Sequence, residues 1–191
     1  IKIEERKKIY DLIYIGNFVD AKDLPLWIEV VREIKKEIPN IKGVMLGDGP
    51  RYDDIKKMIV EKELNDNIEL IGRKKDVFEY INQSKILLMT SKSEALPMAV
   101  IESMSVGVPA VVPNIGDISD IVVNGVNGII IDNRDPRDFA KWIVKLLKNE
   151  TLYEKLKMES ISSIKKLTES CTHDKLVELW SSIFKNLDDN K

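Results

Sequence analysis

The chain has 191 residues, of which 43% are hydrophobic, and a formal net charge of −2 at pH 7. This length predicts one domain with a sizeable core. The slightly acidic balance argues against a nucleic-acid groove, which needs a clustered positive excess. Cys171 is the single cysteine, so an intrachain disulfide and a cysteine-based zinc cluster within the chain are excluded.

Short β-branched runs alternate with longer amphipathic segments along the chain. The apolar runs predict buried parallel strands at 11–16, 43–46, 68–71, 86–89, 110–112 and 128–131. Helices are predicted at 24–37, 51–64, 76–83, 98–106, 118–122, from Pro136 onward, at 151–166 and at 172–187. Because short connections join strands and helices in alternation, we predict an α/β fold, a Rossmann-like doubly wound parallel sheet of about six strands. Residues 136–191 are predicted to form a helical tail of this single domain, 1–191.

Features of the sequence bear on where the protein works. No apolar run approaches the ~20 residues that a membrane helix needs, and no signal peptide is visible. The single cysteine fits a reducing compartment, so we expect a cytoplasmic protein. The first residue is Ile1 rather than Met, and we expect the chain to be a piece of a longer protein.

Glycine, small polar and basic residues follow the predicted strands, in segments 16–23, 47–50, 72–75, 90–94 and 113–116. In a parallel sheet these segments meet at the carboxyl edge, where ligands bind. Glycine permits close backbone approach, which suits phosphate and nucleobase binding. Lys22, Arg51, Arg73 and Lys74 could offset the charge of a diphosphate there. The alternative is that Gly and Asp are common in any strand-to-helix turn.

Two carboxylates stand in a stretch that otherwise lacks charge. Between Glu94 and Asp117 the only charged residue is Glu102, and a carboxylate in such apolar surroundings costs several kcal/mol unless it is hydrogen-bonded. Pro97 is predicted to be the first residue of a helix with Ser93 as its cap. The free amides of residues 98–100 would then form an anion site. The alternative is that Glu102 caps a backbone turn and Glu94 is simply solvated.

The segment from Glu94 to Val112 resembles the Glu-x7-Glu signature of family 4 retaining glycosyltransferases of GT-B fold, in the group 1 glycosyltransferase family. The likeness also includes segments 14–16, 45–50, 69–73 and 116–128, in the family's order, and covers roughly residues 12–147. It implies that this chain is the C-terminal, donor-binding domain. The N-terminal acceptor domain would then be absent.

The resemblance implies a role for each matching residue. Glu94 would bind the donor sugar, Glu102 the ribose, and Lys22 the diphosphate, so Glu94 and Lys22 are the predicted catalytic residues. The amides of Met98 and Ala99 would contact the distal phosphate. The full set of predicted donor-binding residues is Gly16, Asn17, Lys22, Gly47, Gly49, Arg73, Val77, Glu94, Leu96, Pro97, Met98, Ala99 and Glu102.

The implied reaction moves a hexose from a UDP-, GDP- or ADP-sugar to a glycan or lipid-linked acceptor, with retention at the anomeric carbon. Neither cofactor nor metal is expected, and no nucleic-acid partner. The family suggests surface polysaccharide biosynthesis, and the full-length protein could associate peripherally with the inner face of the membrane. The fragment alone is expected to be inactive.

This sequence departs from the family pattern at three positions. Asn17 stands where an arginine is usual, Asp23 where a glycine commonly follows the lysine, and Ala95 where a glycine is usual. Asn17 supplies no charge to a phosphate, and Asp23 places a negative charge beside Lys22. The alternatives are therefore a nucleotide-binding or interaction module that has lost turnover, and a sugar-nucleotide epimerase of the same architecture.

Overall fold

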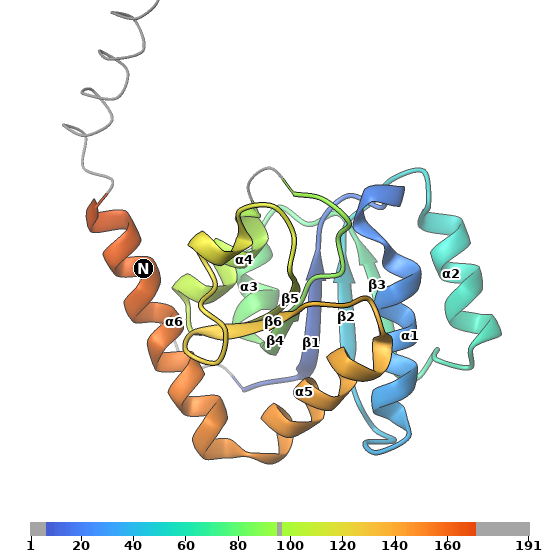
Figure 1. The fold of residues 1–191 in the computed structure, drawn as a ribbon. Helices are drawn as coiled ribbons and strands as arrows, with labels where there is room; N and C mark the ends of the chain where they lie inside the picture. Colours follow the sequence, from blue (N-terminus) through green and yellow to red (C-terminus); the bar gives the residue numbers. More distant parts are fainter. Residues whose placement is uncertain (1–6, 95–96, 171–191) are drawn as a thin grey trace, which may run out of the picture.

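The computed structural model describes residues 7–94 and 97–170 and forms a three-layer α/β domain (Figure 1). The strands are β1 (Tyr10–Ile15), β2 (Gly43–Leu46), β3 (Ile68–Gly72), β4 (Ser84–Leu88), β5 (Ala110–Pro113) and β6 (Gly128–Ile131). The α-helices are α1 (Leu24–Lys35), α2 (Tyr52–Glu61), α3 (Val77–Asn82), α4 (Met98–Ser105), α5 (Pro136–Lys148) and α6 (Glu150–Ser170). Two 3₁₀ turns complete the set, η1 (Asp20–Lys22) and η2 (Ile118–Asp120).

The sheet is wholly parallel, with the strand order β3-β2-β1-β4-β5-β6. β1 pairs with β2 on one side and with β4 on the other, through registers such as Ile13 with Val44 and Ile13 with Leu87. The chain therefore winds outward from β1 in one direction, returns, and winds outward in the other. The point between β1 and β4 is the topological switch point, where ligands bind in open α/β sheets.

Both faces of the sheet are covered, which explains why its strands read as continuous apolar runs. One face packs against α1, α2 and α5 through a core that contains Leu12 and Leu88. The other packs against α3, α4 and α6 and contains Ile13 and Leu87. Successive residues of one strand thus enter opposite cores, as the two-residue period of a strand requires.

Trp27 docks α1 on the sheet close to the switch point. Its side chain is fully buried, and its indole N–H donates a hydrogen bond of 3.1 Å to the carbonyl of Leu88 at the end of β4. A Cβ atom on Gly43 would lie 2.7 Å from the Trp27 ring, so glycine at that position gives the ring its space. This contact fixes the beginning of α1, and with it η1, against the end of β4.

The predicted sheet and its six strands are confirmed, with ends shifted by one or two residues; β4, for example, begins at Ser84 and ends at Leu88. The helix predicted at 118–122 is wrong, since only the 3₁₀ turn η2 forms there. The Asn127 side chain accepts from the Val123 N–H and donates to the Ile121 carbonyl, so it takes backbone groups that a longer helix would use. The predicted helix at 172–187 lies outside the described residues.

Candidate functional site

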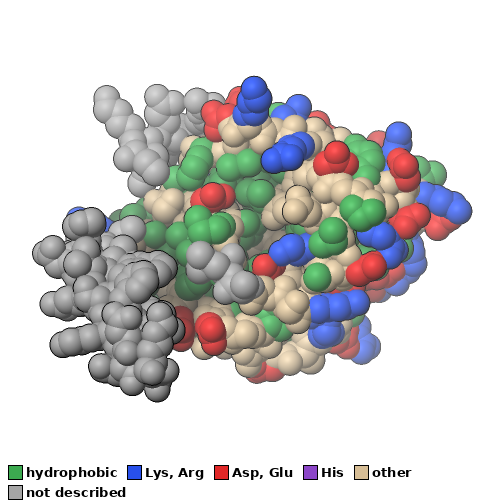
Figure 2. Space-filling view, turned by 90° about the horizontal axis from the view of Figure 1, so that it is seen from above, with side chains coloured by type: hydrophobic (Ala, Val, Ile, Leu, Met, Phe, Trp, Pro, Cys, Tyr) green, Lys and Arg blue, Asp and Glu red, His purple; other side chains and the backbone are tan. Residues whose placement is uncertain are grey.

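A cavity of about 290 Å³ opens at the switch point, at the carboxyl ends of β1 and β4. It is lined by the end of β1 and the loop after it, by η1, by the end of β4 and its loop, and by the start of α4. Its lining residues are Tyr14, Ile15, Gly16, Asn17, Lys22, Leu87, Leu88, Met89, Ser91, Glu94, Pro97, Met98, Ala99 and Glu102. Figure 2 looks onto this edge of the molecule, where hydrophobic and other uncharged groups cover the middle and most Lys, Arg, Asp and Glu side chains lie toward the right.

Lys22 and Glu94 meet inside the cavity. The Lys22 ammonium lies 2.7 Å from Oε1 and 2.8 Å from Oε2 of Glu94. Ser91 Oγ donates a further hydrogen bond of 2.5 Å to Glu94 Oε1. The Glu94 side chain is only 14% exposed and that of Lys22 24%. The alternative that Glu94 is simply solvated is therefore wrong, because its carboxylate is held by two partners.

The helix predicted at 98–106 is confirmed as α4, but its capping differs from the prediction. The helix begins at Met98, and Pro97 is its N-cap residue with no side-chain capping bond. The Pro97 carbonyl accepts from the amides of Val100, at 2.9 Å, and Ile101, at 3.3 Å. Pro97 thus has the half-in position before the first helical residue, and the predicted capping by Ser93 is wrong. Val100 N–H is used by this bond, so only two of the three expected amides remain.

The amides of Met98 and Ala99 make no hydrogen bond to the described residues, and both residues line the cavity. Unpaired amides at a helix start, with the helix dipole behind them, favour an anion. The exposed Met98 side chain leaves this end of the helix open to solvent. The arrangement therefore suits a phosphate group, as the sequence predicts.

Glu102 lies one turn further along α4 and also lines the cavity. Its side chain is half-buried, and within the described part of the chain its carboxylate has no hydrogen-bond or ion-pair partner. The alternative that Glu102 caps a neighbouring turn receives no support from these contacts. A partly buried carboxylate without a partner is available to accept hydrogen bonds from hydroxyl groups of a ligand.

A second cavity of about 170 Å³ adjoins the first and shares Ile15, Gly16 and Asn17 with it. This cavity is lined by Gly47, which the resemblance implies beside the donor, and by Arg73 and Val77, which it implies beside the base. Gly47 permits the two loops to touch, because a Cβ atom there would lie 1.8 Å from the Gly16 carbonyl oxygen. The two cavities together form a continuous cleft across the ends of β1, β2 and β4.

One predicted donor-binding residue of the described chain, Gly49, does not line the cleft. Gly49 lines neither cavity; a Cβ atom there would lie 2.7 Å from the Phe18 carbonyl oxygen, so this glycine serves the packing of two loops. Leu96 lies outside the described residues. Gly49 thus has a structural role beside residue 18, and its contact with the donor stays a prediction.

The structure changes the meaning of Asp23. Its carboxylate does not pair with Lys22 but with Arg134, at 2.6 Å from Nη2. Its backbone has φ 47° and ψ 52°, a left-handed conformation that favours glycine and that Asp also tolerates. The glycine usual at this position is therefore explained by backbone geometry, and the charge of Asp23 is matched by a cation that sequence order does not reveal.

Sequence reasoning missed the polar residues Tyr14 and Ser91, which line the main cavity, and Arg134, which contacts the loops beside it. Ser91 is 1% exposed and holds Glu94; its place three residues before Glu94 was the only available signal. Tyr14 is buried beneath the loop after β1, and its hydroxyl donates to the Asn17 carbonyl at 3.0 Å. Burial and the nearby Glu94 charge raise the pKa of Tyr14, so the phenol stays protonated as a donor. Arg134 gave no signal, since its loop is remote in sequence.

Neither a metal cluster nor a membrane helix is seen in the part of the chain that the structure describes. Residues 7–94 and 97–170 contain no group of three or more His, Cys, Asp or Glu side chains placed to hold a metal ion. Within the same residues, no helix combines the length and the apolar character needed to cross a bilayer.

The chain is a Rossmann-like α/β domain with a cleft at the carboxyl edge of its sheet, of the kind seen in GT-B glycosyltransferases. The sequence model of the group 1 glycosyl transferases matches residues 1–163. The chain therefore belongs to the group 1 glycosyltransferase family.

Individual relatives agree with this assignment. The chain is 29% identical over 146 residues to an uncharacterized glycosyltransferase of Methanocaldococcus jannaschii, covering 75% of this chain and 40% of that protein. It is 26% identical over 182 residues to the N-acetyl-alpha-D-glucosaminyl L-malate synthase of Bacillus anthracis, covering 95% and 46%. The chain thus spans less than half the length of these two relatives.

Solved structures show the same fold. A mutant of S. aureus TarM, in complex with fondaparinux, alpha-GlcNAc-glycerol and UDP, superposes with a TM-score of 0.81 at 26% identity, covering 96% of this chain and 38% of that one. The C-terminal domain of a group 1 glycosyl transferase from Francisella tularensis shares the fold with a TM-score of 0.74 at 18% identity. That comparison covers 84% of this chain and 86% of the Francisella chain.

Proposed function

We propose that residues 1–191 are the donor-binding, C-terminal domain of a family 4 retaining glycosyltransferase of GT-B fold. The observation that carries the proposal is the Lys22–Glu94 pair, placed in a cavity beside the free amides of Met98 and Ala99. A cation, free amides and a carboxylate are the groups that a nucleoside diphosphate sugar needs at its phosphates and its sugar.

In the proposed complex the distal phosphate lies at the amides of Met98 and Ala99. Lys22 then faces the same phosphate and stabilises the charge that gathers on the diphosphate as the glycosidic bond breaks. Fixed donors aimed at developing charge are the main electrostatic device of such catalysis. Glu94 accepts hydrogen bonds from the hydroxyl groups of the donor sugar, and neither carboxylate need transfer a proton.

The remaining parts of the donor follow from the cleft. Glu102, one turn into α4, holds the ribose hydroxyls, and the base lies in the second cavity beside Arg73 and Val77. UDP is the first nucleotide to test, because the related TarM was solved with UDP. GDP and ADP are the other candidates, since all three nucleotides share the diphosphate and the ribose that the residues of the cleft are proposed to contact.

The whole protein is proposed to have a second, N-terminal acceptor domain. This proposal is supported by the fraction of each relative that the chain spans, 40% and 46%, and by its coverage of 86% of a solved C-terminal domain. We propose metal-independent transfer of a hexose to a glycan or lipid-linked acceptor on the cytoplasmic side, in surface polysaccharide biosynthesis. Peripheral membrane association belongs to the same proposal.

One observation favours a second candidate, a nucleotide-binding module without turnover. Asn17 leaves the cavity without the arginine usual at that position. The other reason, the acid at position 23, is weakened because Arg134 neutralises it. The two candidates differ in transfer activity, whereas both require nucleotide binding.

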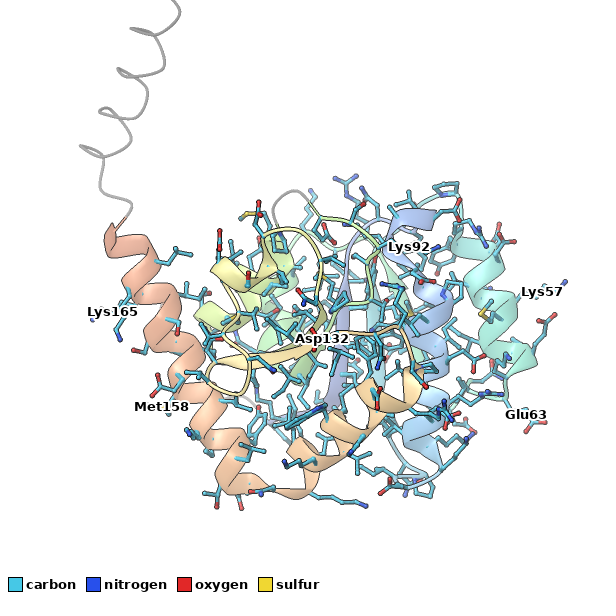
Figure 3. All side chains as sticks on the ribbon, in the orientation of Figure 1. Lys57, Glu63, Lys92, Asp132, Met158 and Lys165 are labelled. Atoms are coloured by element: carbon cyan, nitrogen blue, oxygen red, sulfur yellow. The ribbon has the colours of Figure 1, made fainter. Side chains whose placement is uncertain are left out.

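The test uses the full-length protein. UDP, GDP and ADP are titrated calorimetrically, and transfer from the matching labelled sugar nucleotide is then measured for the wild type, Lys22→Met and Glu94→Gln. Each variant is expected to lose about 10²–10³-fold in turnover, the effect of removing one charge-stabilising group. Lys92→Met is the matched control: this exposed lysine comes from the loop that carries Glu94, at the upper edge of the molecule (Figure 3).

The outcomes separate the candidates. Binding without transfer in the wild type supports the module, and a modified sugar nucleotide formed without acceptor supports an epimerase. No binding of any nucleotide at millimolar concentration contradicts every candidate. Unchanged turnover in Lys22→Met and Glu94→Gln contradicts the catalytic assignments.

A further inference from the structure

Arg134 lies in the loop between β6 and α5 and contacts both of the segments that carry the proposed catalytic residues. We propose that Arg134 is a positioning residue of the donor site, which holds the Asp23 carboxylate away from Lys22. This inference rests on the proposed function, because its readout is nucleotide binding at that site.

The guanidinium makes three contacts with two segments. Nη2 donates to Asp23 Oδ2 and to the Thr90 carbonyl, each at 2.6 Å, and Nη1 donates to the Ser91 carbonyl at 3.1 Å. A planar guanidinium can satisfy such a set of acceptors in fixed directions, which an ammonium cannot. Arg134 is 111 positions from Asp23 and 44 positions from Thr90 in the chain.

Each of these contacts is one step from a proposed catalytic group. Ser91, whose carbonyl is held by Arg134, donates its hydroxyl to Glu94 Oε1 at 2.5 Å. Asp23 follows Lys22 directly, and the Thr90 hydroxyl lies 3.1 Å from the carbonyls of both. Arg134 therefore contacts residues that directly hold or adjoin Lys22 and Glu94. It does not itself line the main cavity.

The Asp23 carboxylate pairs with Arg134 instead of capping the helix that it precedes. Asp23 is the N-cap residue of α1, where an aspartate normally accepts from a helix amide, yet it makes no capping bond. Its carboxylate is directed to Arg134 instead, and is only 18% exposed there. Without Arg134 this anion would stand unpaired beside Lys22, where it would compete for the lysine and repel a diphosphate.

The lysine therefore has two acidic neighbours with different partners. Glu94 pairs with Lys22, and Asp23 pairs with Arg134. Because Arg134 neutralises Asp23, the positive charge of Lys22 is offset by one carboxylate, that of Glu94, and not by two. The residue at 134 thus compensates for the acid at 23.

The test is a thermodynamic cycle in the full-length protein, with the dissociation constant of UDP as readout. The variants are Arg134→Ala, Asp23→Gly and the double variant; glycine suits the left-handed backbone at position 23. Arg134→Ala is expected to weaken UDP binding about fivefold, the effect of losing one partly exposed ion pair. The double variant is expected to return to within about twofold of the wild type.

Rescue by Asp23→Gly separates charge compensation from simple loop damage, because removing an acid would not rebuild the lost contacts to Thr90 and Ser91. Arg137→Ala is the matched control, since Arg137 pairs with Asp135 outside the cavity. Unaltered binding in Arg134→Ala, or equal weakening in the single and double variants, overturns the inference and leaves the proposed function intact. If the wild type shows no binding of UDP, GDP or ADP above the signal of a buffer blank, both the inference and the proposed function are overturned.

Discussion

Lys22 and Glu94, 72 residues apart in the chain, form a bidentate ion pair in which both carboxylate oxygens lie within 2.8 Å of the lysine ammonium. Glu94 thus already neutralises the Lys22 ammonium, which is the group that a diphosphate is proposed to contact. In the proposed complex the diphosphate must therefore share or displace Glu94 to reach Lys22, so the pair would couple the proposed sugar end of the site to its phosphate end.

This coupling predicts opposite effects of Glu94→Gln on binding and on catalysis. The variant frees Lys22 and removes a negative charge near the phosphates, so UDP without a sugar is expected to bind about threefold more tightly. Turnover with the sugar nucleotide is expected to fall, as proposed above. Calorimetry with UDP checks the first effect, and Glu33→Gln is the control, since Glu33 pairs with Lys36 on α1 outside the cavity. Weaker binding of UDP to Glu94→Gln would contradict the coupling.

Ser91 is predicted to orient Glu94. Ser91→Ala removes the hydroxyl donor at 2.5 Å from Oε1 and is expected to lower turnover about tenfold, because loss of a hydrogen bond to a charged group costs about 1.5 kcal/mol or more. Ser93→Ala, at an exposed position two residues on, is expected to change turnover less than twofold. Equal rates for both variants would show that the Ser91 hydroxyl has no orienting role.

Glu102 is predicted to read the ribose. The wild type is expected to bind UDP more tightly than 2′-deoxy-UDP, because one hydroxyl donor to the carboxylate is missing in the second ligand. In Glu102→Ala the preference is expected to disappear while some binding remains through the diphosphate. The two dissociation constants, measured for both proteins, give the result. A preference that survives in Glu102→Ala would place the ribose elsewhere.

Gly47 is predicted to be indispensable for the cleft. Gly47→Ala brings a Cβ atom to 1.8 Å from the Gly16 carbonyl oxygen at φ +152°, whereas a Cβ atom on Gly125, at φ +74°, would have no neighbour within 4 Å among the described residues. Both variants incur backbone strain of about 1–2 kcal/mol. Gly47→Ala adds an overpacking cost of about 1–3 kcal/mol. Urea unfolding compares the two, and equal losses of stability would contradict the close approach of the loops.

Tyr14 is predicted to destabilise the fold at alkaline pH. Burial, together with the Glu94 charge, raises the pKa of Tyr14 above its ordinary value of 10.0. Below pH 10 the folded and unfolded chains both bind the phenolic proton; above pH 10 the unfolded chain releases it first, so stability falls as pH rises. One such group contributes about 1.4 kcal/mol per pH unit.

The test of this alkaline effect is Tyr14→Phe. At pH 7 the variant is expected to lose about 1 kcal/mol, because the hydrogen bond to the Asn17 carbonyl is absent. Between pH 10 and pH 11 its stability is expected to fall less steeply than that of the wild type. Urea unfolding at a series of pH values checks both effects. Parallel pH profiles for the two proteins would contradict the assignment to Tyr14.

Local patterns in the sequence predicted the sheet and most of its helices. Apolar runs are buried on both faces of a parallel sheet wherever they occur, so the six strands could be located without knowing their neighbours. The residues that follow those strands gather at one edge because the strands run parallel, and eight of the donor-binding residues that the family resemblance implies line the main cavity there. The capping of α4 and the extent of the helix predicted at 118–122 were less well predicted, because one proline and the Asn127 side chain decide where backbone groups are paired.

The sequence by itself determined the strands, the carboxyl edge and the candidates on it, since these depend on the residue type and on the direction of the chain. Only the tertiary structure decided the partners. Lys22 faces Glu94 while Asp23 faces Arg134, because strand order brings three loops together at the end of the sheet. Distances between loops depend on how distant helices pack, and no periodicity within one segment records them. The pairing of charges at the site is therefore a property of the folded chain.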